Sequence, residues 1–93
     1  MLSAPSPTID GSGVVSWVNP ASPPAIWVLE LGYADEGWSG YADNSTSVAG
    51  TVTSFDAYTA GWPGGYWVYL SGTDANGNLL YTHTRSGNST KFI

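Results

Sequence analysis

Glycine and proline divide this chain into short apolar segments, and that spacing constrains its fold more than any other feature. The chain holds 12 glycines and 6 prolines, and no window keeps apolar residues at helical spacing for long. Between the breaks, β-branched and aromatic residues alternate with polar ones, which is typical of strands. Several short strands with turn residues between them predict an all-β fold, an antiparallel two-sheet sandwich.

The expected strands belong to one domain. A chain of 93 residues has the size of one small domain with a thin core. Pro5 and Pro7 mark residues 1–8 as a proline-rich lead-in, either a tether or an edge strand, and residues 9–93 as the sandwich domain. About seven strands are expected in such a sandwich. The segments read as strands are 13–18, 25–33, 38–42, 48–55, 66–72 and 79–86, with 90–93 continuing the last one.

Period-two alternation assigns the side chains of segment 25–33 to two faces. Glu30 is expected to point to water, which places Ile26 and Val28 on the same outer face. The residues expected to face inward are Ala25, Trp27, Leu29 and Leu31.

The aromatic segment 66–72 follows the same rule. If Tyr66 faces inward, Trp67 and Tyr69 face outward, and Val68 and Leu70 face the core. The outward side chains of the two segments then predict an apolar contact strip made of Ile26, Val28, Trp67 and Tyr69. The final strand is expected to add Tyr81 or Leu80, depending on its register. The alternative is that nearby loop residues, 56–65 or Pro23-Pro24, cover the outward rings.

Three segments resemble the fibronectin type III family: VVSWVNP, WPGGYWVYLSG and GTDANGN. The first segment carries an inward Trp17, with Pro20 at the strand end. The second is similar to that family's Pro-Gly corner before an inward Tyr66, which implies a tyrosine corner. The third resembles the turn into the last strand, and its Asn76-Gly77 pair independently predicts a tight hairpin. The wider immunoglobulin-like class fits the chain almost as well.

The resemblance also carries an expectation about function. The family is mostly non-catalytic and serves adhesion, spacing and recognition. The sequence is therefore expected to form a structural or adhesive module of a virion or extracellular assembly. Its expected partner is another protein or a second copy, contacted through the apolar sheet face.

A second aromatic cluster offers an alternative function, a carbohydrate-binding module. Trp38 and Tyr41 are flanked by Asp35, Glu36, Asp43 and Asn44, so rings for stacking lie beside acceptors for hydroxyl groups. Trp62 is the third candidate for stacking on a sugar ring. The simpler interpretation, which we favour, is that Trp38 and Tyr41 pack on an edge strand.

Charge and cysteine content exclude several classes of partner. Arg85 and Lys91 are the only strong cations, and the net charge is −5. Binding to nucleic acid or to an anionic membrane surface is therefore not expected. The absence of cysteine excludes disulfides and thiolate zinc sites. No segment is long and apolar enough to insert in a membrane or to act as a signal peptide.

The sequence offers no set of residues suited to catalysis. His83 is the only histidine and occupies an exposed position in a polar row, and no G-x-S-x-G motif occurs. Asp35-Glu36 would need a deep cleft to act as an acid and base pair. At Asp74, a weak calcium site is the alternative to a plain hairpin turn. We expect a protein without a cofactor that is not an enzyme.

Overall fold

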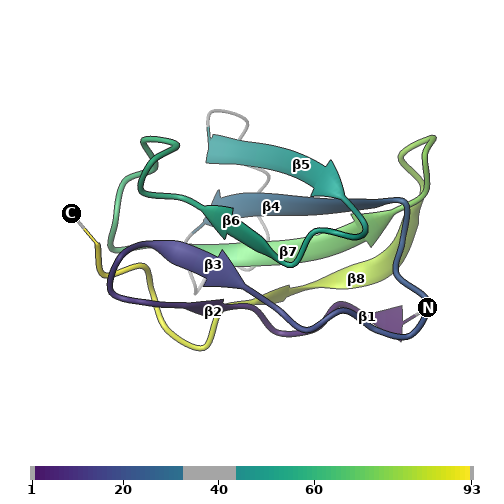
Figure 1. Cartoon of the computed structure of the whole chain (residues 1–93), viewed down its shortest axis with the longest axis horizontal. Helices are drawn as coiled ribbons and strands as arrows, with labels where there is room; N and C mark the ends of the chain where they lie inside the picture. The colour runs from purple at the N-terminus through teal and green to yellow at the C-terminus, as the bar shows by residue number, and fades with distance from the viewer. Residues whose placement is uncertain (1, 33–43, 93) are drawn as a thin grey trace.

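The computed structural model describes residues 2–32 and 44–92, which form two β-sheets and no α-helix. Figure 1 shows the two sheets stacked along the length of the molecule. The predicted strand at 38–42 lies outside the described residues. The strands are β1 (Leu2–Ser3), β2 (Thr8–Ile9), β3 (Val14–Ser16), β4 (Ile26–Gly32), β5 (Ser45–Ala49), β6 (Ser54–Asp56), β7 (Trp67–Thr73) and β8 (Leu79–Arg85).

The strand order is β1-β8-β7-β4-β5 in the larger sheet and β2-β3-β6 in the smaller one. Every described pairing is antiparallel except that of β1 with β8, which is parallel. The expectation of a purely antiparallel fold is therefore wrong at this edge. The parallel pair arises because the start of the chain lies beside its last strand, with Leu2 opposite Tyr81.

The two prolines of the lead-in separate β1 from β2. The Ala4 N–H donates to the Thr82 carbonyl at 2.9 Å, after which Pro5 and Pro7 have no N–H to continue the ladder. Pro7 is buried. The chain therefore leaves the larger sheet between β1 and β2 and enters the smaller one.

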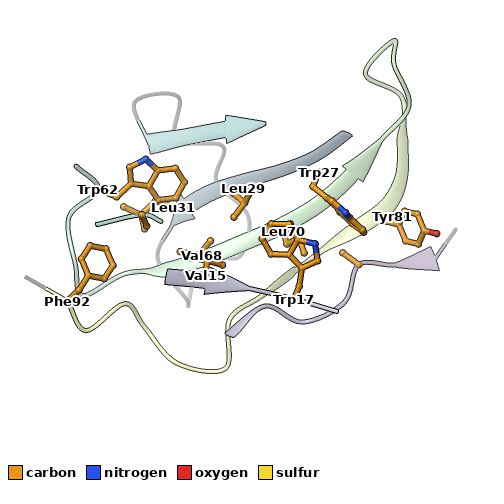
Figure 2. Close-up of a cluster of buried hydrophobic side chains, with 12 residues drawn as sticks. Val15, Trp17, Trp27, Leu29, Leu31, Trp62, Val68, Leu70, Tyr81 and Phe92 are labelled. Atoms are coloured by element: carbon orange, nitrogen blue, oxygen red, sulfur yellow. The ribbon is translucent and has the colours of Figure 1, made fainter. Parts of the chain in front are cut away.

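One hydrophobic core fills the space between the two sheets (Figure 2). The central strands β4 and β7 supply its floor, and their alternation confirms the predicted inward positions of Trp27, Leu29, Leu31, Val68 and Leu70. The smaller sheet contributes Val15 and the segment after it Trp17, while Trp62 and Phe92 close one end. Tyr66 is partly buried and packs against this core.

Two predictions for segment 25–33 are wrong, one about orientation and one about exposure. Ala25 is exposed because it precedes the strand, which begins at Ile26. Glu30 does face away from the core, yet it is only 8% exposed. Its strand lies between two others, and Glu30 stands opposite Ser45 on one side and Tyr69 on the other. A position on a central strand is shielded by both neighbours, which the alternation pattern does not reveal.

The predicted hairpin at Asn76-Gly77 is confirmed. The Asp74 carboxylate accepts the N–H groups of Asn76 at 2.8 Å and Asn78 at 2.9 Å. Gly77 has a φ of +86°, a conformation that glycine adopts without a steric cost. The turn therefore joins β7 to β8 with its backbone donors satisfied.

The Asn19 side chain forms a polar link between the two sheets. The Asn19 amide oxygen accepts the indole N–H of Trp17 at 3.1 Å and that of Trp27 at 2.9 Å. The Asn19 amide nitrogen donates to the Gly50 carbonyl at 2.8 Å. The two indole rings meet edge to face, 6.3 Å apart between centroids. One side chain thus satisfies both buried indoles and connects the two sheets.

Candidate contact surface

The predicted strip lies on one face, the outer face of the larger sheet, but its members are spread along it. Ile26 stands opposite Thr73 and Val28 opposite Ser71. Tyr69 stands opposite Glu30, and Trp67 opposite Gly32. Each apolar side chain therefore faces a polar residue or glycine across the strand pair. The four residues form a diagonal line, so Trp67 and Tyr69 do not stand directly beside Ile26 and Val28 as expected.

The strip also exposes less apolar surface than expected. Ile26, Val28 and Trp67 are half-buried, and Tyr69 is only 4% exposed. The Tyr69 ring meets the exposed His83 ring edge to face, with 6.1 Å between centroids. Tyr69 is therefore part of the packed structure, and the accessible part of the strip is limited to the other three residues.

A cation, Arg85, lies over the Trp67 ring, and the alternation pattern did not predict this contact. The Arg85 guanidinium lies 4.1 Å from the centroid of the Trp67 ring. Arg85 stands opposite Tyr69 in the ladder of β7 and β8, which brings it to the outer face. Trp, Tyr and Arg are the residue types that dominate binding energy at protein interfaces. Only the register of β8 reveals this pair, and the sequence alone does not give that register.

The large apolar side chains that are exposed lie elsewhere. Leu2 of β1 and Leu79 and Leu80 of β8 are exposed on neighbouring strands, and we call these three residues the β1–β8 apolar edge. Leu79 stands opposite Thr73, which in turn stands opposite Ile26. Leu79 therefore adjoins the outer-face strip at the Ile26 end, whereas Leu2 stands opposite the core-facing Tyr81. Val18 and Tyr58 are large and exposed as well, but they lie on other segments.

Sequence reasoning left open whether Leu80 or Tyr81 faces outward, and it missed Leu2 and Leu79, because β8 is irregular. The ladder of β7 and β8 shifts register between Leu70 and Gly72 and again between Gly72 and Thr73. Tyr81 consequently faces the core, where it packs on Trp27 with centroids 5.4 Å apart. An irregular strand breaks the period of two on which the prediction of faces depends.

The sugar-stacking interpretation loses one of its three rings. Trp62 is only 7% exposed and packs in the core against Phe55, 5.1 Å away between centroids. The expectation that Trp62 stacks on a sugar is therefore wrong. The Trp62 backbone N–H donates to the Ala57 carbonyl at 3.0 Å. This bond folds the loop back so that the indole ring enters the core. Trp38 and Tyr41 lie outside the described residues.

The Asp74 carboxylate is engaged by its own turn. Besides the two backbone N–H groups, the Asn78 amide donates to it at 2.9 Å. Hydrogen bonds from the Asn78 side chain, then from the Asn78 backbone, lower the pKa of Asp74 below its ordinary value. The described part of the chain contains no group of three or more His, Cys, Asp or Glu residues arranged for a metal ion. The arrangement at Asp74 is that of a hairpin turn.

Within residues 2–32 and 44–92 there is no helix of the length and hydropathy needed to cross a membrane. No protein-family model, curated protein or solved structure matches the chain. A function can therefore be inferred only from the strand arrangement and from the surfaces described above.

Proposed function

We propose that this protein is a non-catalytic, fibronectin type III-like module that acts by surface contact in an extracellular or virion assembly. The strand arrangement supports the assignment. In immunoglobulin-type sandwiches, the first, second and fifth strands share one sheet, and the third, sixth and seventh share the other. Counting from β2, the same division holds here: β2, β3 and β6 against β4, β7 and β8.

The fourth strand separates this arrangement from an immunoglobulin constant domain. In a constant domain the fourth strand joins the sheet of the first, second and fifth. Here β5, the fourth of the described strands when they are counted from β2, pairs with β4. Three further features agree with the segments that resemble the fibronectin type III family. Trp17 is buried, Tyr66 just before β7 is partly buried, and Asn76-Gly77 forms a turn.

The observation that carries the contact proposal is the β1–β8 apolar edge. Its three leucines are exposed on adjacent strands, and one of them, Leu79, shares a row of the sheet with the half-buried Ile26. Large exposed apolar side chains gathered on neighbouring strands are typical of a site of interaction. Trp67 and its stacked Arg85 extend the same face with the residue types favoured at interfaces. The partner is a second copy of the chain or another protein.

Light scattering across a range of concentrations tests the proposal. We expect a rise in apparent mass with concentration that the double variant Leu2→Ser/Leu80→Ser abolishes and Trp67→Ser weakens. Added salt should strengthen the association, because it screens the repulsion between copies that each carry a net charge of −5. Tyr58→Ser, at an exposed site on the β6–β7 loop, is the matched control. A protein that stays monomeric throughout and ignores both variants would contradict self-association.

A further inference from the structure

A hollow of about 400 Å³ lies beside Phe92, at the end of the core that this ring closes (Figure 2). It is lined by Gly11, Ser12, Tyr58, Lys91 and Phe92. This volume falls in the lower part of the range of small-molecule sites, about 300–1,000 Å³. Three segments distant in sequence meet there: the β2–β3 turn, the β6–β7 loop and the last described residues.

The β2–β3 turn forms a rigid first wall. The Asp10 carboxylate accepts the N–H groups of Ser12 at 2.9 Å and Val14 at 3.0 Å. Gly13 has a φ of +86°, and a Cβ there would lie 2.7 Å from the Tyr58 Cβ. The turn therefore needs glycine at this position both for its backbone and for close packing against the second wall.

The β6–β7 loop forms the second wall and presents an aromatic ring. The Asp56 carboxylate accepts the Thr59 N–H at 3.1 Å and its hydroxyl at 2.8 Å, and hydrogen bonds from the Thr59 backbone, then its side chain, lower the Asp56 pKa. The Ala57 N–H donates to the Gly13 carbonyl at 2.9 Å, which joins the two walls. Tyr58 remains 55% exposed. Its ring is held in place and open to a ligand.

The last described residues form the third wall and supply a cation, Lys91. Thr90 is fully buried and exchanges backbone hydrogen bonds with the segment at Tyr66. Phe92 is buried and meets Tyr58 edge to face, 5.9 Å apart between centroids. Lys91 lies between these two anchors, is exposed and lines the hollow. Within the described part of the chain, no acidic group forms an ion pair with its ammonium.

We propose that this hollow binds a saccharide that carries a carboxylate. The Tyr58 ring offers an apolar face for sugar C–H groups, and the Lys91 ammonium offers a counter-charge for the carboxylate. The Ser12 hydroxyl and the backbone at Gly11 can bond to sugar hydroxyls. The two acids nearby, Asp10 and Asp56, already accept hydrogen bonds from their own turns.

The test is a titration followed by amide chemical shifts, with trigalacturonate as the probe and neutral galactotriose as its matched partner. We expect saturable shifts at Gly11, Ser12 and Tyr58 with trigalacturonate. Lys91→Gln should lower the affinity about fivefold, the value of one exposed ion pair. Lys91→Arg should retain binding, and Tyr58→Ala should lose it while the spectrum elsewhere stays that of the folded protein.

Arg85→Gln is the matched control, because it removes the other cation of the chain on the outer face of the larger sheet and should leave the affinity unchanged. Trisaccharides of glucuronate and mannuronate and a sialyl-oligosaccharide extend the titration to other acidic sugars. The proposal is overturned if none of these probes shifts the hollow at millimolar concentration. Equal binding of galactotriose, or an equal loss in Arg85→Gln and Lys91→Gln, would overturn it too. The site is separate from the β1–β8 apolar edge, so its failure leaves the proposed function intact.

Discussion

Replacing Asn19 by alanine should destabilise this protein far more than the loss of a polar side chain on its surface. The substitution removes the acceptor that the indole N–H groups of Trp17 and Trp27 share, at 3.1 and 2.9 Å. It also removes the donor to the Gly50 carbonyl. A buried donor left without a partner costs about 1–3 kcal/mol.

The two indoles do not contribute equally to this cost. Trp27 is fully buried, so its N–H cannot recover a bond to water, whereas Trp17 is 6% exposed. We therefore expect a loss of about 2–5 kcal/mol in the free energy of unfolding, a large share of the roughly 5–15 kcal/mol typical of a domain. The melting temperature should fall by at least about 10 °C in a chain of this length.

Urea unfolding followed by tryptophan fluorescence measures this loss, with near-ultraviolet circular dichroism to verify that the fold persists. Asn76→Ala is the matched control, since Asn76 is exposed in the hairpin turn and its loss should stay within about 0.5 kcal/mol. Asn19→Asp keeps the acceptor and loses the donor to Gly50, so it should fall between the two. A loss in Asn19→Ala no larger than that of the control would refute the reasoning.

Three further substitutions test separate parts of the structure. Gly50→Ala should destabilise by at least about 3 kcal/mol or prevent folding, because a Cβ would lie 1.7 Å from the Pro24 carbonyl oxygen; thermal melting measures this, and a native melting curve would contradict it. Arg85→Gln should cost at most about 1 kcal/mol, the value of an exposed cation–π contact over Trp67, in urea unfolding; a larger loss would mean that Arg85 has another role. The folded-state pKa of Asp74 is lowered, so its contribution is present above its unfolded pKa and is lost as pH falls through the folded value. Unfolding measured from neutral pH to below about pH 4 should therefore depend less on pH in Asp74→Asn, and identical pH curves for the two proteins would contradict a stabilising role of this carboxylate.

The inner faces of the sheets were predictable because burial there follows alternation alone. Trp27, Leu29, Val68 and Leu70 each face the core as the period of two requires. The hairpin at Asn76-Gly77 was predictable as well, since its turn chemistry is local. Both features depend on residues that are neighbours in the sequence.

The outer surface was not predictable, because it depends on register and on the path of loops. Alternation placed Tyr69 outward but could not show that Glu30 stands beside it. Nor could it show that an irregular β8 turns Tyr81 inward and leaves Leu80 exposed. Trp62 was misassigned for a similar reason, since a loop that bonds back on itself carries the ring into the core. Such features are set by contacts between segments far apart in the chain.

The most direct test of the proposed function is to record amide chemical shifts of the wild-type protein as a function of its own concentration. Such shifts report which surface meets a second copy. We predict that they concentrate at Leu2, Leu79 and Leu80 and extend toward Ile26, while Tyr58 at the far end does not move. Shifts confined to the far end, or none at any concentration, would contradict association through the β1–β8 apolar edge.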